Sequence, residues 1–181
     1  MIKLIVVVVL LLITALLLYA ATRPGSFRVQ RSIGIRAAPE KIFALLNDFH
    51  NWADWSPWEK LDPAMKKTWQ GASSGVGAVH AWEGNSKVGQ GCMEIMEASA
   101  PGRLLIKLDF FKPFEAHNMA EYTLEPRGDS TEVTWAMYGP NRYFSKIMGL
   151  FFSMDRMVGG QFEDGLARLK VLAERQAGGG A

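Results

Sequence analysis

Three histidines and a few acidic residues carry the acid–base and metal-binding chemistry available to this chain. His50, His80 and His117 lie in different segments, without the H-x-x-x-H or H-E-x-x-H spacing of a zinc site. A metal site would need the fold to bring them to acids such as Glu94 and Glu121, so no metal is expected. A carboxylate or an imidazole on a concave apolar face would have a shifted pKa and would be able to act as an acid or a base.

The remaining motifs do not indicate nucleophilic, dinucleotide-binding or disulfide chemistry. The chain has no G-x-S-x-G elbow. Its two G-x-G stretches, at 75–77 and 89–91, lie inside expected hairpins rather than between a strand and a helix. Cys92 is the only cysteine, which rules out an internal disulfide and a cysteine-based zinc cage. No cofactor is therefore expected.

The charge balance argues against nucleic acid as a partner. Of the 181 residues, 20 are Lys or Arg and 18 are Asp or Glu, a formal net charge of +2. Lys3 and Arg23 flank the first apolar stretch, so the rest of the chain has no net charge and no basic run. The length suits one domain of ordinary size with a short appendage.

An uninterrupted apolar stretch, Leu4–Ala21, begins near the N-terminus. Its 18 uncharged residues would form about 27 Å of helix, close to the thickness of the bilayer hydrocarbon. A cleaved signal peptide is the alternative, but its apolar region is usually shorter, and Leu18–Thr22 is a poor cleavage site. We therefore expect residues 1–25 to be a single-pass membrane anchor and linker. The short N-terminal tail before the anchor favours a domain outside the cytoplasm.

Beyond the linker, hydrophobic periodicity predicts a strand, two short helices, a run of strands and a final helix. Phe27–Ile35 alternates with period two, and a helix begins at Pro39 and ends near Asn47. Phe49–Trp58 is an aromatic helix or turn, and Met154–Ala173 has the three- and four-residue steps of an amphipathic helix. The further strand-like segments are Gly75–Gly84, Gly89–Ala98, Arg103–Phe111, Ala116–Glu125 and Thr131–Gly139.

This order predicts an α+β domain over residues 26–176, followed by a flexible tail at 177–181. Strands joined by short turns form an antiparallel meander. A curved sheet wrapped around the long C-terminal helix would bury every apolar face of these elements. One helix rarely fills such a concave sheet, so we expect a cavity between the helix and the sheet.

Five segments of the chain combine into a known pattern. They are Arg31–Phe43, Asn51–Trp58, Gly75–Gly91, Thr131–Trp135 and Phe162–Lys170. Together they resemble the START-like (SRPBCC) superfamily, in its polyketide cyclase/dehydrase and lipid transport branch. The resemblance implies the helix-grip fold, in which the sheet wraps the C-terminal helix. It does not choose a function, because this fold hosts lipid carriers, cyclases, chaperone activators and hormone receptors.

Aromatic residues are concentrated in two places. Trp52, Trp55 and Trp58 are spaced by three, so they would share one side of a helical turn. They would form an aromatic wall over a ligand cavity, or a packing contact between the short helices and the sheet, and the two roles are compatible. The second place is Phe110–Phe114, which would lie either in the core or near the cavity mouth.

Alternation along the strands indicates which side chains face the helix. The strand from Ala116 has two candidate faces, and we choose the face of Ala120 and Tyr122 as inward because it carries no charge. His117 and Glu121 then point outward, and the cavity is nearly free of acid–base groups. The expected cavity residues are Trp52, Trp55, Trp82, Leu104, Ile106, Leu108, Phe110, Ala120, Tyr122, Trp135, Met137, Val158 and Phe162.

The main hypothesis is a membrane-tethered module that binds a hydrophobic or amphipathic small molecule, with lipids among the candidates. Its membrane contact is residues 4–21. An enzyme of the polyketide cyclase/dehydrase kind is the alternative, and it would need an inward-facing histidine or carboxylate with a shifted pKa. A third hypothesis is a protein-interaction domain, as in chaperone activators of similar fold. An exposed apolar patch and a filled cavity would favour it.

Overall fold

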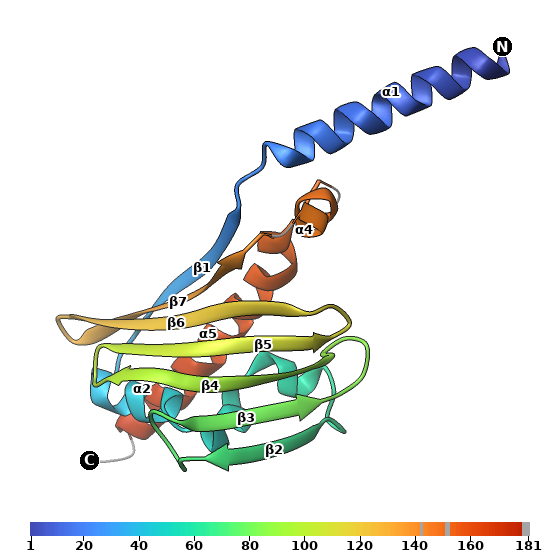
Figure 1. The fold of residues 1–181 in the computed structure, drawn as a ribbon. Helices are drawn as coiled ribbons and strands as arrows, with labels where there is room; N and C mark the ends of the chain where they lie inside the picture. The colour runs from blue at the N-terminus through green and yellow to red at the C-terminus, as the bar shows by residue number, and fades with distance from the viewer. Residues whose placement is uncertain (142, 151–152, 179–181) are drawn as a thin grey trace.

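Seven antiparallel strands form one sheet that curves around the C-terminal helix in the computed structural model, which describes residues 1–141, 143–150 and 153–178 (Figure 1). The strand order is β1-β7-β6-β5-β4-β3-β2. The strands are β1 (Ser26–Ile35), β2 (Lys66–Gly71), β3 (Ala78–Glu83), β4 (Gln90–Ser99), β5 (Arg103–Lys112), β6 (Ala116–Arg127) and β7 (Ser130–Pro140). The helices are α1 (Ile2–Ala21), α2 (Pro39–Leu46), η1 (Phe49–Asn51), α3 (Trp52–Trp55), η2 (Pro57–Lys60), α4 (Tyr143–Met148) and α5 (Met154–Gly178).

The predicted α+β class and helix-grip arrangement are confirmed, and β2 is the strand that the sequence did not indicate. Its sequence, Lys-Lys-Thr-Trp-Gln-Gly, has no apolar alternation. It forms an edge of the sheet and pairs only with β3. Because an edge strand can remain largely in water, it needs no continuous buried face. At the other end of the domain, α5 continues to Gly178, and residues 179–181 lie outside the described residues.

Helix α5 packs against the concave face of the sheet through apolar side chains and two glycines. The ring of Phe162, which is 1% exposed, stacks on Trp135 with centroids 4.0 Å apart. A Cβ atom at Gly165 would lie 2.9 Å from the Trp135 ring, and one at Gly159 would overlap the Arg31 guanidinium. Each glycine weakens the helix by about 1 kcal/mol, and the close approach that it permits explains its presence.

An arginine on the inner face of β1 fixes the first turns of α5. The Arg31 guanidinium donates to Glu163 at 2.6 Å and to both carboxylate oxygens of Asp155 at 2.8 and 3.0 Å. Both acids are more than half exposed, so water screens these ion pairs and each contributes little to stability. The contacts nevertheless hold the N-terminal half of α5 against the edge strand.

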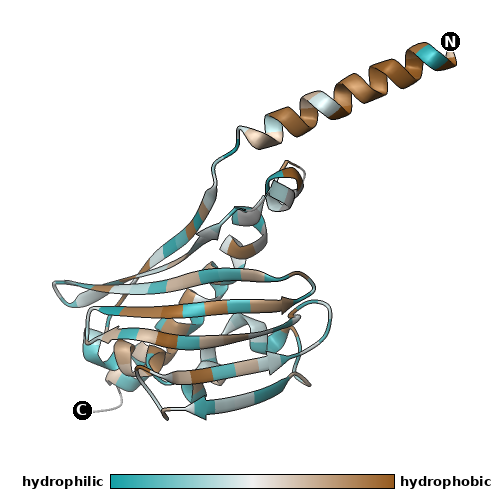
Figure 2. Ribbon diagram, viewed as in Figure 1, coloured by the Kyte–Doolittle hydropathy of each residue, from teal (hydrophilic) through white to brown (hydrophobic). Residues whose placement is uncertain are grey.

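Helix α1 lies outside the domain and is apolar along nearly all of its length (Figures 1 and 2). Its length and composition suit a membrane span, and a signal sequence would meet the same criteria. Residues 22–25 connect it to β1. The Tyr143 hydroxyl of α4 donates to the Leu17 carbonyl at 2.8 Å, and Asn141 donates to the carbonyls of Pro24 and Gly25. The base of α1 therefore contacts the segment that leads from β7 into α4.

Candidate ligand cavity

A cavity of about 350 Å³ lies between the concave face of the sheet, the short helices and the first half of α5. Six aromatic rings form much of its wall: Trp52 from α3, Trp58 from η2, Trp82 from β3, Phe110 from β5, Trp135 from β7 and Phe162 from α5. Trp58 packs edge to face against Trp135 with centroids 5.6 Å apart, and Trp82 packs in the same way against Phe110 at 5.7 Å. The Trp135 ring also stacks on Phe162. A volume of this size lies at the lower end of the range for small-molecule sites.

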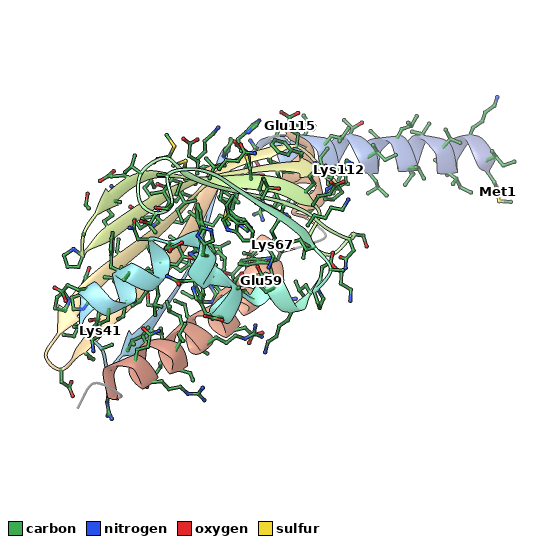
Figure 3. The ribbon with its side chains drawn as sticks, turned by 90° about the horizontal axis from the view of Figure 1, so that it is seen from below. Met1, Lys41, Glu59, Lys67, Lys112 and Glu115 are labelled. Carbon is green, nitrogen blue, oxygen red and sulfur yellow. The ribbon has the colours of Figure 1, made fainter. Side chains whose placement is uncertain are left out.

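Two lysines line the edge of this cavity. Lys87 comes from the β3–β4 loop, Lys112 is the last residue of β5, and Pro113 begins the β5–β6 turn. Lys112 lies at the end of the domain from which α1 projects, whereas Lys41 marks the opposite end (Figure 3). Next to the edge, Phe111 and Phe114 are 49% and 67% exposed, while Phe110 faces the cavity. The Phe110–Phe114 stretch therefore divides between the cavity wall and the surface.

Nine of the thirteen predicted cavity residues line the cavity, and the other four lie in the core behind it. Trp55 packs edge to face against Tyr122 and Trp135. Leu104 and Ile106 belong with Tyr122 to the half of the sheet that is filled by α2 and the C-terminal half of α5. The nine that line the cavity are Trp52, Trp82, Leu108, Phe110, Ala120, Trp135, Met137, Val158 and Phe162.

The predicted orientation of β6 is confirmed. Ala120 and Tyr122 are buried on the inner face, and His117 and Glu121 lie on the outer face. His117 bonds to Asp109 at 2.8 Å and to Glu115 at 3.1 Å, and the hydrogen bond to Asp109 is the largest cause of its raised pKa. These outer groups form surface ion pairs away from the cavity.

The expectation that the cavity is nearly free of acid–base groups is wrong, because His80 and Glu59 line it. His80 is 5% exposed, and neither of its ring nitrogens has a hydrogen-bond partner among the described residues. Burial disfavours the charged ring and lowers the pKa of His80 to about 4. The imidazole is therefore neutral near pH 7. A signal for this placement was present in the sequence, since His80 is two residues before Trp82 and shares its face of β3.

The surroundings of His80 are aromatic on one side and ionic on the other. Trp69, its neighbour across the β2–β3 pair, stacks on it with centroids 5.6 Å apart, and Phe49 lies at 5.9 Å. Glu59 is paired with Lys67 at 2.6 Å, and both side chains are largely buried. Because this ion pair is closed, its two charges largely compensate each other beside the ring. Next to His80 the cavity wall thus carries a carboxylate whose charge is balanced by Lys67, and its other charged lining residues, Lys87 and Lys112, lie at the edge.

Several lining residues were not predicted, because they come from turns and short helices whose side-chain direction does not follow a regular period. The lining residues outside the predicted set include Ser56, Trp58, Glu59, Leu61, Met65, His80, Val88, Met93 and Gln161.

Within residues 1–141, 143–150 and 153–178, no group of three His, Cys, Asp or Glu is placed to hold a metal.

Residues 26–174 match the protein family described as polyketide cyclase/dehydrase and lipid transport. The chain belongs to this family. Membership implies a hydrophobic ligand and agrees with the aromatic cavity, although the family covers both enzymes and carriers. No curated protein matches the chain.

Solved structures share the fold at low sequence identity. A protein from Nitrosospira multiformis is 19% identical with a TM-score of 0.59, and the match covers 83% of this chain and 99% of that one. The Aha1 dimer from Colwellia psychrerythraea is 18% identical with a TM-score of 0.56, covering 82% and 96%. The di-domain ARO/CYC StfQ of the steffimycin biosynthetic pathway is 10% identical with a TM-score of 0.60, covering 84% of this chain and 52% of StfQ. These likenesses establish the helix-grip fold.

Proposed function

We propose that this family member is a membrane-held module that binds a hydrophobic or amphipathic small molecule, including lipids, in the aromatic cavity. The observation that carries the proposal is the 350 Å³ space with its wall of six Trp and Phe rings. Apolar burial contributes roughly 25 cal/mol per Å² before the ordering costs of binding are subtracted. A cavity of this kind supplies affinity by burial and needs few polar contacts.

The proposed membrane attachment is α1 as an uncleaved anchor, with the domain outside the cytoplasm. The apolar length of α1 and the cavity edge at the α1 end of the domain support this arrangement. The full chain should remain in membranes through an alkaline wash, and its intact mass should include residues 1–25. Release by the wash, or a mass that lacks this segment, would contradict the anchor. Protection of the domain from protease added to the outside of intact cells would contradict the proposed side.

A cyclase or dehydratase activity is the second candidate, and the position of His80 favours it. A neutral imidazole beside an apolar ligand has the protonation state of a general base at neutral pH. Among proteins of similar fold, StfQ is a di-domain ARO/CYC of the steffimycin biosynthetic pathway, and DynU16 belongs to the dynemicin biosynthetic locus. Turnover of a polyketide substrate that disappears in His80→Phe while binding persists would place this candidate ahead of simple binding.

A volume-filling substitution tests the binding function directly. Ala120 lines the cavity and is 5% exposed, so the indole in Ala120→Trp would occupy ligand space. We expect lipophilic molecules to be identified by mass spectrometry in extracts of the wild-type chain and to be lost from this variant. Ala81→Trp is the matched control, because Ala81 lies on the opposite face of β3. Equal ligand content in wild type and Ala120→Trp would contradict the proposed site.

A further inference from the structure

His80 is a buried polar side chain of the cavity wall whose hydrogen-bonding capacity the protein leaves unused. Both ring nitrogens are enclosed and find no partner among the described residues, although the residue is 95% removed from solvent. An unpaired buried polar group costs free energy, and most such groups in proteins are paired. Trp69 stacks on the ring and Phe49 contacts it at a tilt, and His80 also lines the cavity. Because both nitrogens are enclosed, a ligand group in the cavity reaches one of them when the imidazole turns about its Cβ–Cγ bond.

The groups around the His80 ring favour a ligand group that carries no charge. The nearest carboxylate of the wall, Glu59, is already bonded to Lys67 at 2.6 Å, so neither charge is free to compensate a charged ligand group. Placing an unpaired charge in such a buried site is strongly unfavourable. A neutral imidazole has one donor nitrogen and one acceptor nitrogen, and a hydroxyl group can pair with either because it both donates and accepts.

We propose that His80 is the specificity-determining residue of the cavity, and that the ligand is an apolar molecule whose hydroxyl group hydrogen-bonds to the imidazole. This inference rests on the proposed binding function and adds the chemical class of the ligand. The chain runs along β3 from His80 to Trp82 and then into the loop that carries Lys87 at the cavity edge. His80 is therefore farther from that edge than Trp82. The hydroxyl is therefore at the inner end of the ligand, and the apolar body lies against Trp82 and Phe110.

Two probes that differ by one hydrogen-bond donor test the proposal. The full chain in lipid nanodiscs is titrated with 2-naphthol and with 2-methoxynaphthalene by calorimetry, and the heat of partition into empty nanodiscs is subtracted. Wild type should bind 2-naphthol about tenfold more tightly, the effect of one buried hydrogen bond. His80→Phe should still bind 2-methoxynaphthalene and should lose the preference. His117→Phe, on the outer face, should keep it.

The outcomes separate this inference from the function on which it rests. If wild type binds neither probe, the binding function itself is contradicted. If it binds both equally, the cavity binds apolar molecules and the role of His80 is overturned. A preference that persists in His80→Phe would place the hydroxyl at the Trp135 indole, whose nitrogen is also buried without a described partner, and would overturn the assignment as well.

A measurement on the wild-type chain covers the case in which His80→Phe does not fold. In a ¹⁵N-histidine-labelled sample, 2-naphthol should shift the ring-nitrogen resonances of His80, and 2-methoxynaphthalene should shift them much less. His80→Gln identifies these resonances by their loss. Unchanged His80 resonances in the presence of bound 2-naphthol would overturn the proposal.

Discussion

The two faces of the sheet place the same residue type in opposite chemical situations. His80, on the concave face, is enclosed by aromatic rings and has no polar partner among the described residues, and burial lowers its pKa to about 4. His117, on the convex face, is 46% exposed at its side chain and bonds to Asp109 and Glu115, which raise its pKa. The difference shows that the face of a strand, rather than residue identity, decides whether a histidine here serves the cavity or the surface.

The helix that fills the concave face offers the most severe test of this comparison. Phe162 of α5 faces the sheet and is 1% exposed, whereas Val171 of the same helix is 49% exposed. Phe162→Ala should lower the free energy of unfolding by about 3–5 kcal/mol, because it leaves a hole beside Trp135. Val171→Ala should change it by no more than about 0.5 kcal/mol. Urea denaturation measures both, and a loss below about 1 kcal/mol for Phe162→Ala would contradict its place in the core.

The two histidines should act on stability in opposite pH ranges. The pKa of His80 is lower in the folded protein than its usual 6.5, so the unfolded chain takes up the proton first as the pH falls. The free energy of unfolding should be unaffected by this ring above pH 6.5 and should fall by about 3 kcal/mol between pH 6.5 and 4. This loss should be smaller in His80→Phe, as measured by urea denaturation at a series of pH values. A wild-type pH profile that is superimposable on that of the variant would contradict the burial of the ring.

For His117 the sign is reversed. Its raised pKa means that the protonated ring is favoured in the folded state, so its contribution is present below pH 6.5 and is lost as the pH rises through the raised value. Removing it with His117→Gln should therefore destabilise the protein at acidic pH and have little effect in the alkaline range. A chemical-shift titration of the two rings would show the histidine pKa values directly, one below and one above 6.5.

Two glycines of α5, one facing the sheet and one facing open space, are expected to give the smallest effects on stability. A Cβ atom at Gly165 would press on Trp135 and Pro57, whereas one at Gly160 would meet nothing within 4 Å. Gly165→Ala should therefore destabilise the protein. Overpacking costs about 1–3 kcal/mol, and the better helix propensity of alanine offsets part of that cost. Gly160→Ala should stabilise it by about 0.5–1 kcal/mol. Opposite shifts of the melting temperature are expected, and shifts of the same sign would show that the close approach at Gly165 is relieved by movement of α5.

The sequence was sufficient for the fold because its periodicities are regular. Alternation in β5, β6 and β7 placed Ile106, Tyr122 and Trp135 on the inner face, and burial of these three residues agrees. It could not find β2, since an edge strand such as Lys66–Gly71 needs no buried face. It also could not separate cavity from core, because Trp55 and Trp52 have the same local pattern, and only the path of α5 decides which ring borders open space. His80 was left unplaced for a different reason: alternation by itself allows either face of β3, and its spacing of two residues from Trp82 is the signal that puts both on the inner face.

The short connection between α1 and the domain limits what the molecule can do with a bound ligand. Four residues, 22–25, span at most roughly 14 Å when fully extended, and the bonds from Asn141 to Pro24 and Gly25 shorten their free length further. With α1 in a bilayer, the domain cannot travel to a second membrane or diffuse through the surrounding solution. It would exchange its ligand only with its own bilayer or with a molecule that reaches it there, and it would not carry the ligand from one membrane to another.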